Sequence, residues 1–389
     1  MKISAHPLWL VGFRPFFSLA CLSGMLLPIV WALMFSGVLA PPAAPFTTTQ
    51  WHAHEMFFGF GWAVLGGFLL TSTKNWVKIR GYHGNALILL VAAWLLERAG
   101  MWFAGDLPPL LFRLSNNLFL GAIVALLLLT LLRHRADDSY RSDNVFFLFV
   151  LPAFLVAKNL LLSGDGELVE VGESMAVGLF RMAFLVMFER TLTQFMKGVF
   201  QVDILRNPLL DRAIKLLALA FVFEALLPRG LAAGIALALA LLLLVRFAFW
   251  KPQLALRRID IGIMYLGYLA LVAQLLVEFL GVAAPVEWVG SVSIHVFTFG
   301  VMGLVIPAML IRISNGHTGR KVVFDARDKL ALWIMIAAFL LRVVMPQLFP
   351  AAYLRWIEIA AACWFACFAL LAWRYIPYLL QARVDGKEH

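Results

Sequence analysis

The stretch GLAAGIALALALLLLVRFAF, residues 230–249, decides the fold class of this chain. Its only charged side chain is Arg246. A helix of about 20 apolar residues is long enough to cross the roughly 30 Å of hydrocarbon in a bilayer. Apolar runs of similar length recur from one end of the 389-residue sequence to the other. We therefore expect a polytopic membrane protein rather than a water-soluble domain.

The composition supports this class, because 63% of the residues are hydrophobic and only 14% are charged. Globular proteins have about 45–50% apolar and about 25% charged residues. We predict an all-α bundle of about twelve transmembrane helices that forms a single integral membrane domain over residues 1–389. The predicted helices cover residues 10–36, 54–71, 85–103, 114–132, 144–162, 173–196, 212–227, 230–249, 260–280, 288–311, 329–345 and 352–376.

Lysine and arginine residues concentrate in alternate loops, which predicts the orientation in the membrane. Loops rich in these residues stay in the cytoplasm. With an even number of helices, both termini are then expected to be cytoplasmic. The net charge of +10 would also suit a nucleic-acid-binding protein. Because the basic residues lie in short loops, we expect the lipid bilayer as partner and no nucleic acid. The basic loop residues include Lys74, Lys78, Arg80, Arg133, Arg135, Arg141, Lys197, Arg206, Arg257, Arg258, Arg320 and Lys321.

Polar side chains at membrane depth are costly, so each is a candidate for function. Those on the predicted outer side come from seven predicted helices, and a bundle could gather them around one polar cavity. The alternative is that they form structural salt bridges between helices, such as Glu97 or Glu224 with Arg181 or Lys158. The set comprises His52, His54, Glu55, Glu97, Arg98, Asn116, Asn117, Lys158, Asn159, Arg181, Glu224 and His295.

Only three of the eight histidines, His52, His54 and His295, lie at this outer level. Neutral imidazole is a common ligand for metals and for haem iron, although a buried histidine is often only a hydrogen-bonding group. At about 100° per residue, His52 and His54 point roughly 200° apart on a helix. They cannot then bind the same metal. The same arithmetic places His52 on one face with Gly59, Ala63, Gly66 and Gly67, where another helix or a flat cofactor could approach.

Two further patterns allow a functional and a structural interpretation. His295 lies above Phe299, Met302, Ile306 and Met309, which would suit a porphyrin but is equally typical of a bundle core. Cys363 and Cys367 share one helix face and could bind copper as thiolates. Neither cysteine has a histidine at its depth, so packing explains the pair.

Several motifs of this chain resemble the NnrS family, and together they extend over nearly its whole length. The motif at the start of the chain is GFRPFF, and the second predicted helix opens with WHAHEM. The late motif includes a histidine, two glycines and the run GHTGR. The matching residues are Gly12–Phe17, Trp51–Met56, Phe58–Phe60, Asn75, Trp76, His295, Gly300, Gly303, Arg312 and Gly316–Arg320.

The resemblance implies a haem- and copper-containing protein of the bacterial inner membrane that takes part in the nitric oxide, or nitrosative stress, response. It implies His52, His54 and His295 as the metal-site residues, a b-type haem with copper as cofactors, and nitric oxide as ligand. Arg14, Arg312, His317 and Arg320 are signature residues to which the resemblance assigns no role.

The chain is also similar to the catalytic subunit of haem–copper oxidases, which holds a haem between histidines of its second and tenth helices. His54 and His295 fall on the corresponding predicted helices, so this likeness implies that they are axial ligands. His52, with Glu55 or Met56, would then serve the second metal. Arg98, Lys158 and Arg181 would neutralise the haem propionates. The sequence lacks the histidines that build the oxidase copper centre, so oxygen reduction of that type is not expected.

Two other functions suit the same helix count. A secondary transporter or metal permease would use the outer polar residues as a substrate or proton site. The sequence shows neither an inverted repeat nor a matching pair of broken helices, which are typical of such transporters. A factor that delivers metal to a partner during assembly is the other alternative.

Overall fold

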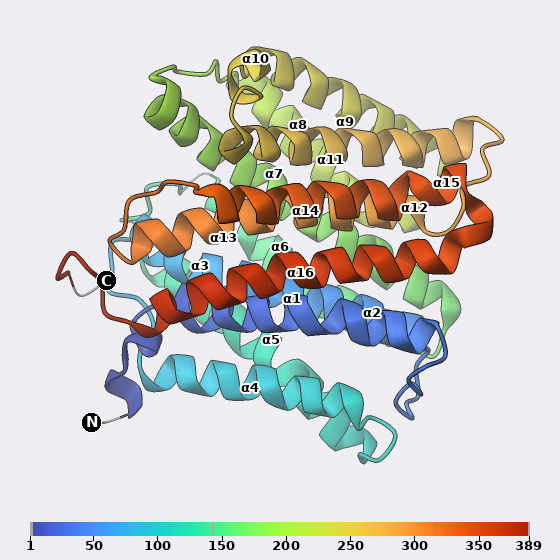
Figure 1. The fold of residues 1–389 in the computed structure, drawn as a ribbon, viewed down its shortest axis with the longest axis horizontal. Helices are drawn as coiled ribbons and strands as arrows, with labels where there is room; N and C mark the ends of the chain where they lie inside the picture. Colours follow the sequence, from blue (N-terminus) through green and yellow to red (C-terminus); the bar gives the residue numbers. More distant parts are fainter. Residues whose placement is uncertain (1–2, 142, 388–389) are drawn as a thin grey trace. The chain divides into compact units, whose positions relative to one another are not determined.

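Helices form all of the regular secondary structure in the described part of the chain, residues 3–141 and 143–387 of a computed structural model. Eleven of these helices are long and apolar enough to cross a membrane. The all-α polytopic bundle predicted from the sequence is thereby confirmed. Figure 1 shows the helices with their labels.

Five of the spans are composite helices, and the other six are single α-helices. The spans are α1 (Phe13–Phe35), α2 (Thr48–His54) with η3 (Glu55–Gly61) and α3 (Trp62–Trp76), α4 (Asn85–Trp102), α5 (Pro109–Arg133), η4 (Asn144–Phe146) with α6 (Phe147–Leu161), α7 (Gly166–Phe200), α9 (Arg229–Phe249), α11 (Ile259–Ala283), α12 (Val292–His295) with η6 (Val296–Gly303) and α13 (Leu304–His317), α14 (Ala326–Val343) with α15 (Met345–Leu348), and η7 (Pro350–Ala352) with α16 (Tyr353–Leu380). Three short helices lie outside the spans: η1 (Ile3–Ala5), η2 (Pro7–Trp9) and α10 (Pro252–Ala255).

The span predicted at 212–227 is interrupted, which is the main difference from twelve continuous helices. It consists of α8 (Pro208–Ala220) followed by the 3₁₀ helix η5 (Phe221–Leu226). Phe223 leaves the helical region, with φ −103° and ψ 24°. At 1.5 Å per residue, α8 alone is about 20 Å long and does not cover the hydrocarbon thickness.

The second span begins earlier than predicted, at Thr48 instead of residue 54. Thr47 and Gln50 form a capping box, in which each side chain accepts a hydrogen bond from the backbone N–H of the other residue. This cap stabilises an extra helical segment that opens with the polar residues Thr48, Thr49 and Gln50, which hydrophobicity alone does not reveal. His52 and His54 both lie in the last turn of α2 as a result.

The chain divides into two compact units, each built from separated segments. Unit 1 comprises residues 1–172, 310–323 and 368–389, and unit 2 comprises residues 173–309 and 324–367. His54 belongs to unit 1 and His295 to unit 2.

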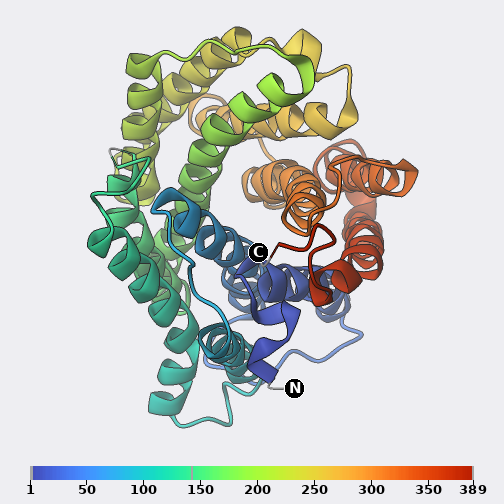
Figure 2. The same ribbon diagram turned by 90° about the vertical axis from the view of Figure 1, so that its left-hand side faces the viewer.

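In unit 1, close helix packing depends on glycines. A Cβ atom on Gly67 of α3 would lie 2.8 Å from the Cβ of Phe16 in α1, and one on Gly66 would lie 2.7 Å from Cδ1 of Ile123 in α5. These two glycines therefore serve helix packing, which was one of the two interpretations of the small-residue face. Figure 2 shows the blue α1 and its neighbours nearly end-on.

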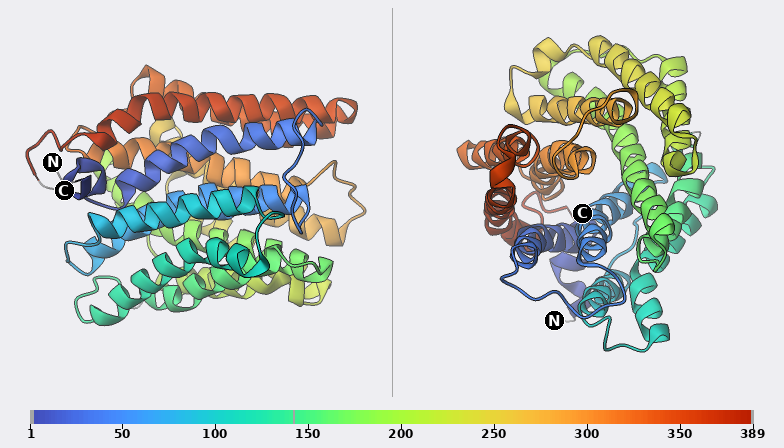
Figure 3. Two further views of the ribbon diagram at one scale, coloured as in Figure 1. Left: turned by 90° about the horizontal axis from the view of Figure 1, so that it is seen from below. Right: turned by 90° about the vertical axis from the view of Figure 1, so that its right-hand side faces the viewer.

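Both ends of the chain lie at the same end of unit 1. The Arg14 side chain in the first turn of α1 donates a hydrogen bond of 2.9 Å to the carbonyl oxygen of Leu379, at the end of α16. Figure 3 shows the loop from α1 to α2 at the opposite end of α1. A backbone hydrogen bond of 2.8 Å from Gly105 N to Ala43 O holds this loop. The start of α1 and the end of α16 therefore lie side by side at one end of unit 1.

In unit 2, a buried ionic network joins α7, α8, α9 and α11. Arg246 has 2% of its side chain exposed, and its Nη1 lies 3.4 Å from Asp211 Oδ1 and 3.9 Å from Glu189 Oε2. Lys215 Nζ lies 3.2 Å from Glu189 Oε1. Tyr268 accepts a hydrogen bond of 3.1 Å from Arg246 Nε. These contacts connect neighbouring helices, so the network has a structural role.

Candidate functional site

Two spans change from α-helix to π-helix immediately after a histidine. His54 is the last residue of α2, before η3, and His295 is the last residue of α12, before η6. In a π-helix the hydrogen bonds run from residue i to i+5, and such turns occur frequently at functional sites. Each histidine packs on the phenylalanine four residues later, with ring centroids 5.6 Å apart for Phe58 and 6.1 Å for Phe299. The sequence carries this signal as His-x3-Phe-Gly, which occurs in both spans.

The His54 imidazole is completely buried in unit 1 and is held by a carboxylate. Its Nδ1 lies 3.2 Å from Oε1 of Glu55, and the other oxygen of Glu55 lies 3.3 Å from Nε of Arg98. The arginine favours the ionised form of Glu55, which can only accept a hydrogen bond. With Glu55 ionised, Nδ1 of His54 carries the hydrogen and Nε2 presents its lone pair. Nε2 lies 3.7 Å from Oε1 of Glu97, and it makes no contact of hydrogen-bond length among the described residues.

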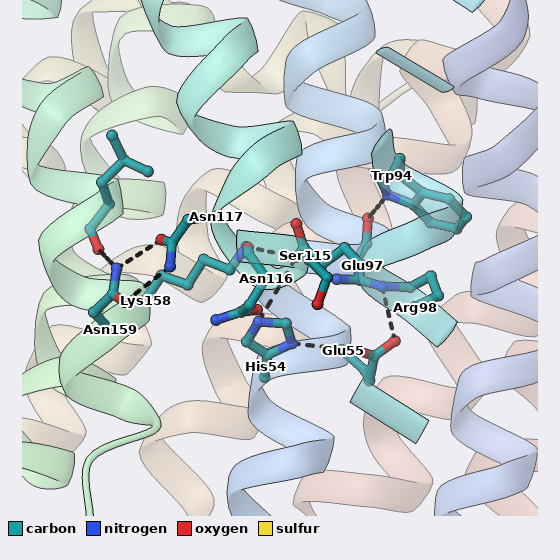
Figure 4. Close-up of polar contacts among 12 residues, drawn as sticks. His54, Glu55, Trp94, Glu97, Arg98, Ser115, Asn116, Asn117, Lys158 and Asn159 are labelled. Carbon is teal, nitrogen blue, oxygen red and sulfur yellow. Dashed lines mark hydrogen bonds and ion pairs between the residues drawn. The ribbon is translucent and has the colours of Figure 1, made fainter. Parts of the chain in front are cut away.

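Buried charges of both signs surround His54, as Figure 4 shows. The carboxylate of Glu97 lies 2.6 Å from Lys158 Nζ, and it also pairs with the guanidinium of Arg98. Lys158 donates a second hydrogen bond to the backbone carbonyl of Asn116. Two cations and two carboxylates therefore balance, and the predicted salt bridge between Glu97 and Lys158 is confirmed.

Gly59 leaves the space that the Arg98 side chain occupies. A Cβ atom at residue 59 would come within 2.2 Å of Nη1 of Arg98. The Gly59 carbonyl accepts a hydrogen bond of 3.1 Å from the indole nitrogen of Trp94. The prediction that Gly59 shares a face with His52 is therefore wrong, because the π-helical turn changes the angular position of every residue after His54.

The side chains of His52 and His54 have different neighbours, as predicted from the angle between them on a helix. Its ring stacks on Trp31 of α1, with centroids 4.2 Å apart and an angle of 17° between the planes. It is half-buried. No group of three histidine, cysteine or acidic side chains within the described ranges is arranged to hold a metal ion.

The His295 imidazole in unit 2 has its nitrogens engaged in a similar way to those of His54. Nδ1 lies 2.7 Å from the carbonyl oxygen of Ser291, which can only accept, so Nδ1 carries the hydrogen. Nε2 then accepts a hydrogen bond of 3.2 Å from Nη2 of Arg342. Arg342 also reaches the hydroxyl of Tyr353, 3.5 Å away. Arg342 is not among the candidate residues predicted from the sequence, although an arginine inside an apolar run is a detectable signal.

The apolar residues that follow His295 belong to the core of unit 2. Phe299 packs edge-on against Trp364 with ring centroids 4.7 Å apart, and Met302 and Ile306 are buried. Packing accounts for them, which was one of the two interpretations of this pattern.

Arg181 lies in a second buried polar cluster, also in unit 2. Its side chain is fully buried, and Nε donates a hydrogen bond of 3.2 Å to Gln274. Nη2 is 4.0 Å from Glu224, which confirms the predicted pairing of these residues. Neither Nη1 nor Nη2 has a hydrogen-bond partner in the part of the chain described. Gln274 continues the cluster to Glu278 and Ser293, which the sequence analysis did not include.

The arrangement of the two imidazoles suits metal coordination. Histidines that ligate metals commonly donate the other ring N–H to a carboxylate or a backbone carbonyl, which fixes the tautomer and the ring orientation. His54 and His295 have this arrangement, with Glu55 and with the Ser291 carbonyl respectively. In both cases Nε2 is the nitrogen with the lone pair.

The sequence profile described as NnrS protein matches residues 7–383. The chain belongs to the NnrS family. At the level of the family, this membership associates it with haem or metal and with the nitric oxide response. No curated protein is similar enough to this NnrS-family chain to count as a match.

Proposed function

We propose that this NnrS-family protein binds haem, with Nε2 of His54 as the ligand atom in unit 1 and Nε2 of His295 as the ligand atom in unit 2, and that it acts in the nitric oxide response of the bacterial inner membrane. The observation that supports the proposal is the shared state of the two imidazoles. A hydrogen-bond acceptor holds Nδ1 of each ring, so both Nε2 lone pairs are directed away from that contact. Bound haem supplies the iron that has affinity for nitric oxide.

The surrounding residues would prepare His54 for this role. Glu55 keeps the hydrogen on Nδ1 and makes the imidazole a stronger donor. Arg98 lies 3.3 Å from Glu55 and favours the ionised form of this carboxyl group. Phe58 fixes the ring from one side. The cluster excludes water, since the side chain of His54 is completely buried.

At His295 the same role requires one change, because Arg342 occupies the direction of the Nε2 lone pair. Arg342 would have to release Nε2 for His295 to become a ligand. Among the basic residues proposed to neutralise the propionates, Lys158 and Arg98 already pair with carboxylates. Arg181 retains two nitrogen atoms without hydrogen bonds to the described residues, so it is the strongest candidate of the three.

Copper at His52 is a separate part of the proposal, which rests on the family resemblance. The ring of His52 stacks on Trp31, and Glu55 is engaged with His54 and Arg98. Metal analysis of the purified protein tests this part, with His52→Ala as the variant that should lose copper and keep haem.

The absorption spectrum of protein purified from haem-replete cells tests the haem proposal. We expect a Soret band that shifts with nitric oxide and a pyridine haemochrome of b type. His54→Ala or His295→Ala should remove most of the band, whereas His83→Ala, at an exposed loop histidine, should leave it unchanged. A colourless wild-type protein would refute haem binding.

One observation favours transport as a second candidate function. Secondary transporters place their sites where pairs of helices are irregular in corresponding positions. The spans α2–η3–α3 and α12–η6–α13 both contain a π-helical segment, and buried charged groups lie beside the first. Flux into proteoliposomes tests this function. Lys158→Met should abolish flux if the cluster carries the substrate or protons, whereas the haem proposal predicts no flux.

A further inference from the structure

Two arginines of the family motifs, to which the haem proposal assigns no role, meet at the end of α16 in unit 1. Arg14 Nη1 donates hydrogen bonds to the carbonyl oxygens of Leu379, 2.9 Å, and Gln381, 2.6 Å. Arg320 Nη2 donates to the side-chain oxygen of the same Gln381, 3.2 Å. Residues that are more than 300 positions apart in the sequence therefore converge on one helix end.

A third arginine joins them from the C-terminal tail. Arg383 Nη1 donates a hydrogen bond of 3.0 Å to the carbonyl oxygen of His317, and Val384 N donates one of 3.1 Å to the carbonyl of Thr318. The positive charges of Arg383 and Arg320 both act on Arg14. We call Arg14, Arg320 and Arg383 the arginine cluster.

The arginine cluster has more hydrogen-bond donors than acceptors. Arg14 is completely buried. Its Nε and Nη2, and Nη1 of Arg320, are buried without a hydrogen-bond partner among the described residues. Asp385 forms an ion pair with Arg383, but within residues 3–141 and 143–387 no carboxylate pairs with Arg14 or Arg320. Like charges buried together without a counter-charge destabilise a fold.

We propose that the arginine cluster binds a phosphate-bearing anion. A phosphate group offers three or more acceptor oxygens, and guanidinium groups bind such oxygens through paired hydrogen bonds. Two guanidinium groups contribute three unpaired nitrogen atoms here, and the oxygens of one phosphate group can accept a hydrogen bond from each. Arg320 and Arg383 are partly exposed and Arg14 is buried beneath them, so an anion would enter from the surface.

The hydrogen bonds that join Arg14 of α1 to the end of α16 do not account for these unpaired nitrogen atoms. Those hydrogen bonds use only Nη1 of Arg14. The guanidinium of Arg320 lies over the ring of Tyr378, 3.9 Å from its centroid, which fixes the plane of the group. Gly319, at φ 80°, lets the tail lie against the loop, because a Cβ there would be 2.7 Å from Cγ of Asp385.

The same chemistry could come from a lipid headgroup or from free phosphate. Basic pockets at the ends of transmembrane helices bind anionic headgroups. The test therefore has two arms, both with the full-length protein. In the first, thermal unfolding in a neutral detergent is followed against inorganic phosphate, with chloride keeping the ionic strength constant. In the second, native mass spectrometry compares retention of phosphatidylglycerol and phosphatidylcholine after nanodisc reconstitution.

The variants are Arg320→Gln and a control with the same charge change, Arg257→Gln, at an exposed residue. We expect saturable binding in at least one arm, weakened about tenfold or more by Arg320→Gln and unchanged by Arg257→Gln. A response to inorganic phosphate identifies a free anion, and selective retention of phosphatidylglycerol identifies a headgroup. If Arg320→Gln does not fold, Arg320→Lys keeps the charge, and loss of the paired hydrogen bonds should still weaken binding.

Two results would overturn the proposal. The first is no saturable effect of phosphate and no preference for phosphatidylglycerol in the wild-type protein. The second is binding that neither substitution at residue 320 weakens more than Arg257→Gln does.

Discussion

Glu97→Gln removes the carboxylate that two buried cations share in unit 1. The ammonium of Lys158 lies 2.6 Å from Glu97, and both side chains are completely buried. Arg98 would keep its ion pair with Glu55, but Lys158 would keep only the backbone carbonyl of Asn116. Removing one partner of a buried pair costs about 3–5 kcal/mol, because it leaves an uncompensated charge. The ratio of folded to unfolded protein should therefore fall at least about a hundredfold.

Two companion variants make this prediction specific. Lys158→Met should cost less than Glu97→Gln, because Glu97 would still pair with Arg98. The double variant Glu97→Gln/Lys158→Met removes both charges together. It should be more stable than the sum of the two single effects predicts, since neither charge is left alone.

The assay is unfolding of the purified protein in mixed micelles with increasing sodium dodecyl sulfate, followed by circular dichroism. Glu358→Gln is the matched control at an exposed position, where we expect a change within about 0.5 kcal/mol. The reasoning is refuted if Glu97→Gln costs no more than this control. It is also refuted if the double variant costs as much as the two single variants added together.

Three further predictions concern other parts of the chain. Gly59→Ala should displace Arg98 and lower stability by about 1–3 kcal/mol, measured in the same unfolding assay, because the added Cβ would meet Nη1 at 2.2 Å. Arg342→Gln should speed haem uptake, measured by Soret absorbance, because it removes the guanidinium from Nε2 of His295. A hydrogen bond from the neighbouring arginine lowers the pKa of Asp385 to about 2 from its usual 3.8. The ion pair between Arg383 and Asp385 in the C-terminal tail should therefore persist above about pH 4 and weaken as the pH falls towards 2. Hydrogen exchange of the backbone amides in this tail measures the effect.

Each of these predictions has a control. Gly121→Ala meets no atom within 4 Å and should be neutral or slightly stabilising, as expected for a helical glycine in open space. Arg355→Gln, at an exposed arginine, should not change haem uptake. Asp385→Asn should make the exchange of the tail independent of pH between 2 and 4, apart from intrinsic exchange. Similar effects in control and test variants would contradict the corresponding argument.

Most of the spans could be predicted because each is an apolar run of the required length. The span predicted at 230–249 is α9, Arg229–Phe249, and the one predicted at 260–280 lies within α11, Ile259–Ala283. Two predictions were less accurate for local reasons. Residues 212–227 contain the break at Phe223, and the turn before residue 54 depends on a capping box of polar side chains. Hydrophobicity averaged over a window detects neither feature.

The candidate site was predicted only in part. The pairs Glu97–Lys158 and Arg181–Glu224 were recognised, because charged groups inside apolar runs are conspicuous. The metal-site role of His52, His54 and His295 stays a prediction. The contact of Arg342 with His295 and the position of Gly59 against Arg98 were not recognised. A helix wheel assumes about 100° per residue throughout, and the π-helical turns after both histidines break that assumption.

By itself, the sequence determined that this chain is a polytopic helical membrane protein of the NnrS family, because apolar length, loop charge and motifs are properties of single segments. The tertiary structure alone decided which buried charges neutralise each other and which groups the ring nitrogens of His54 and His295 contact. Such pairings depend on which helices are neighbours and on their rotation about their axes. In a bundle of similar apolar helices, only the packed structure specifies both.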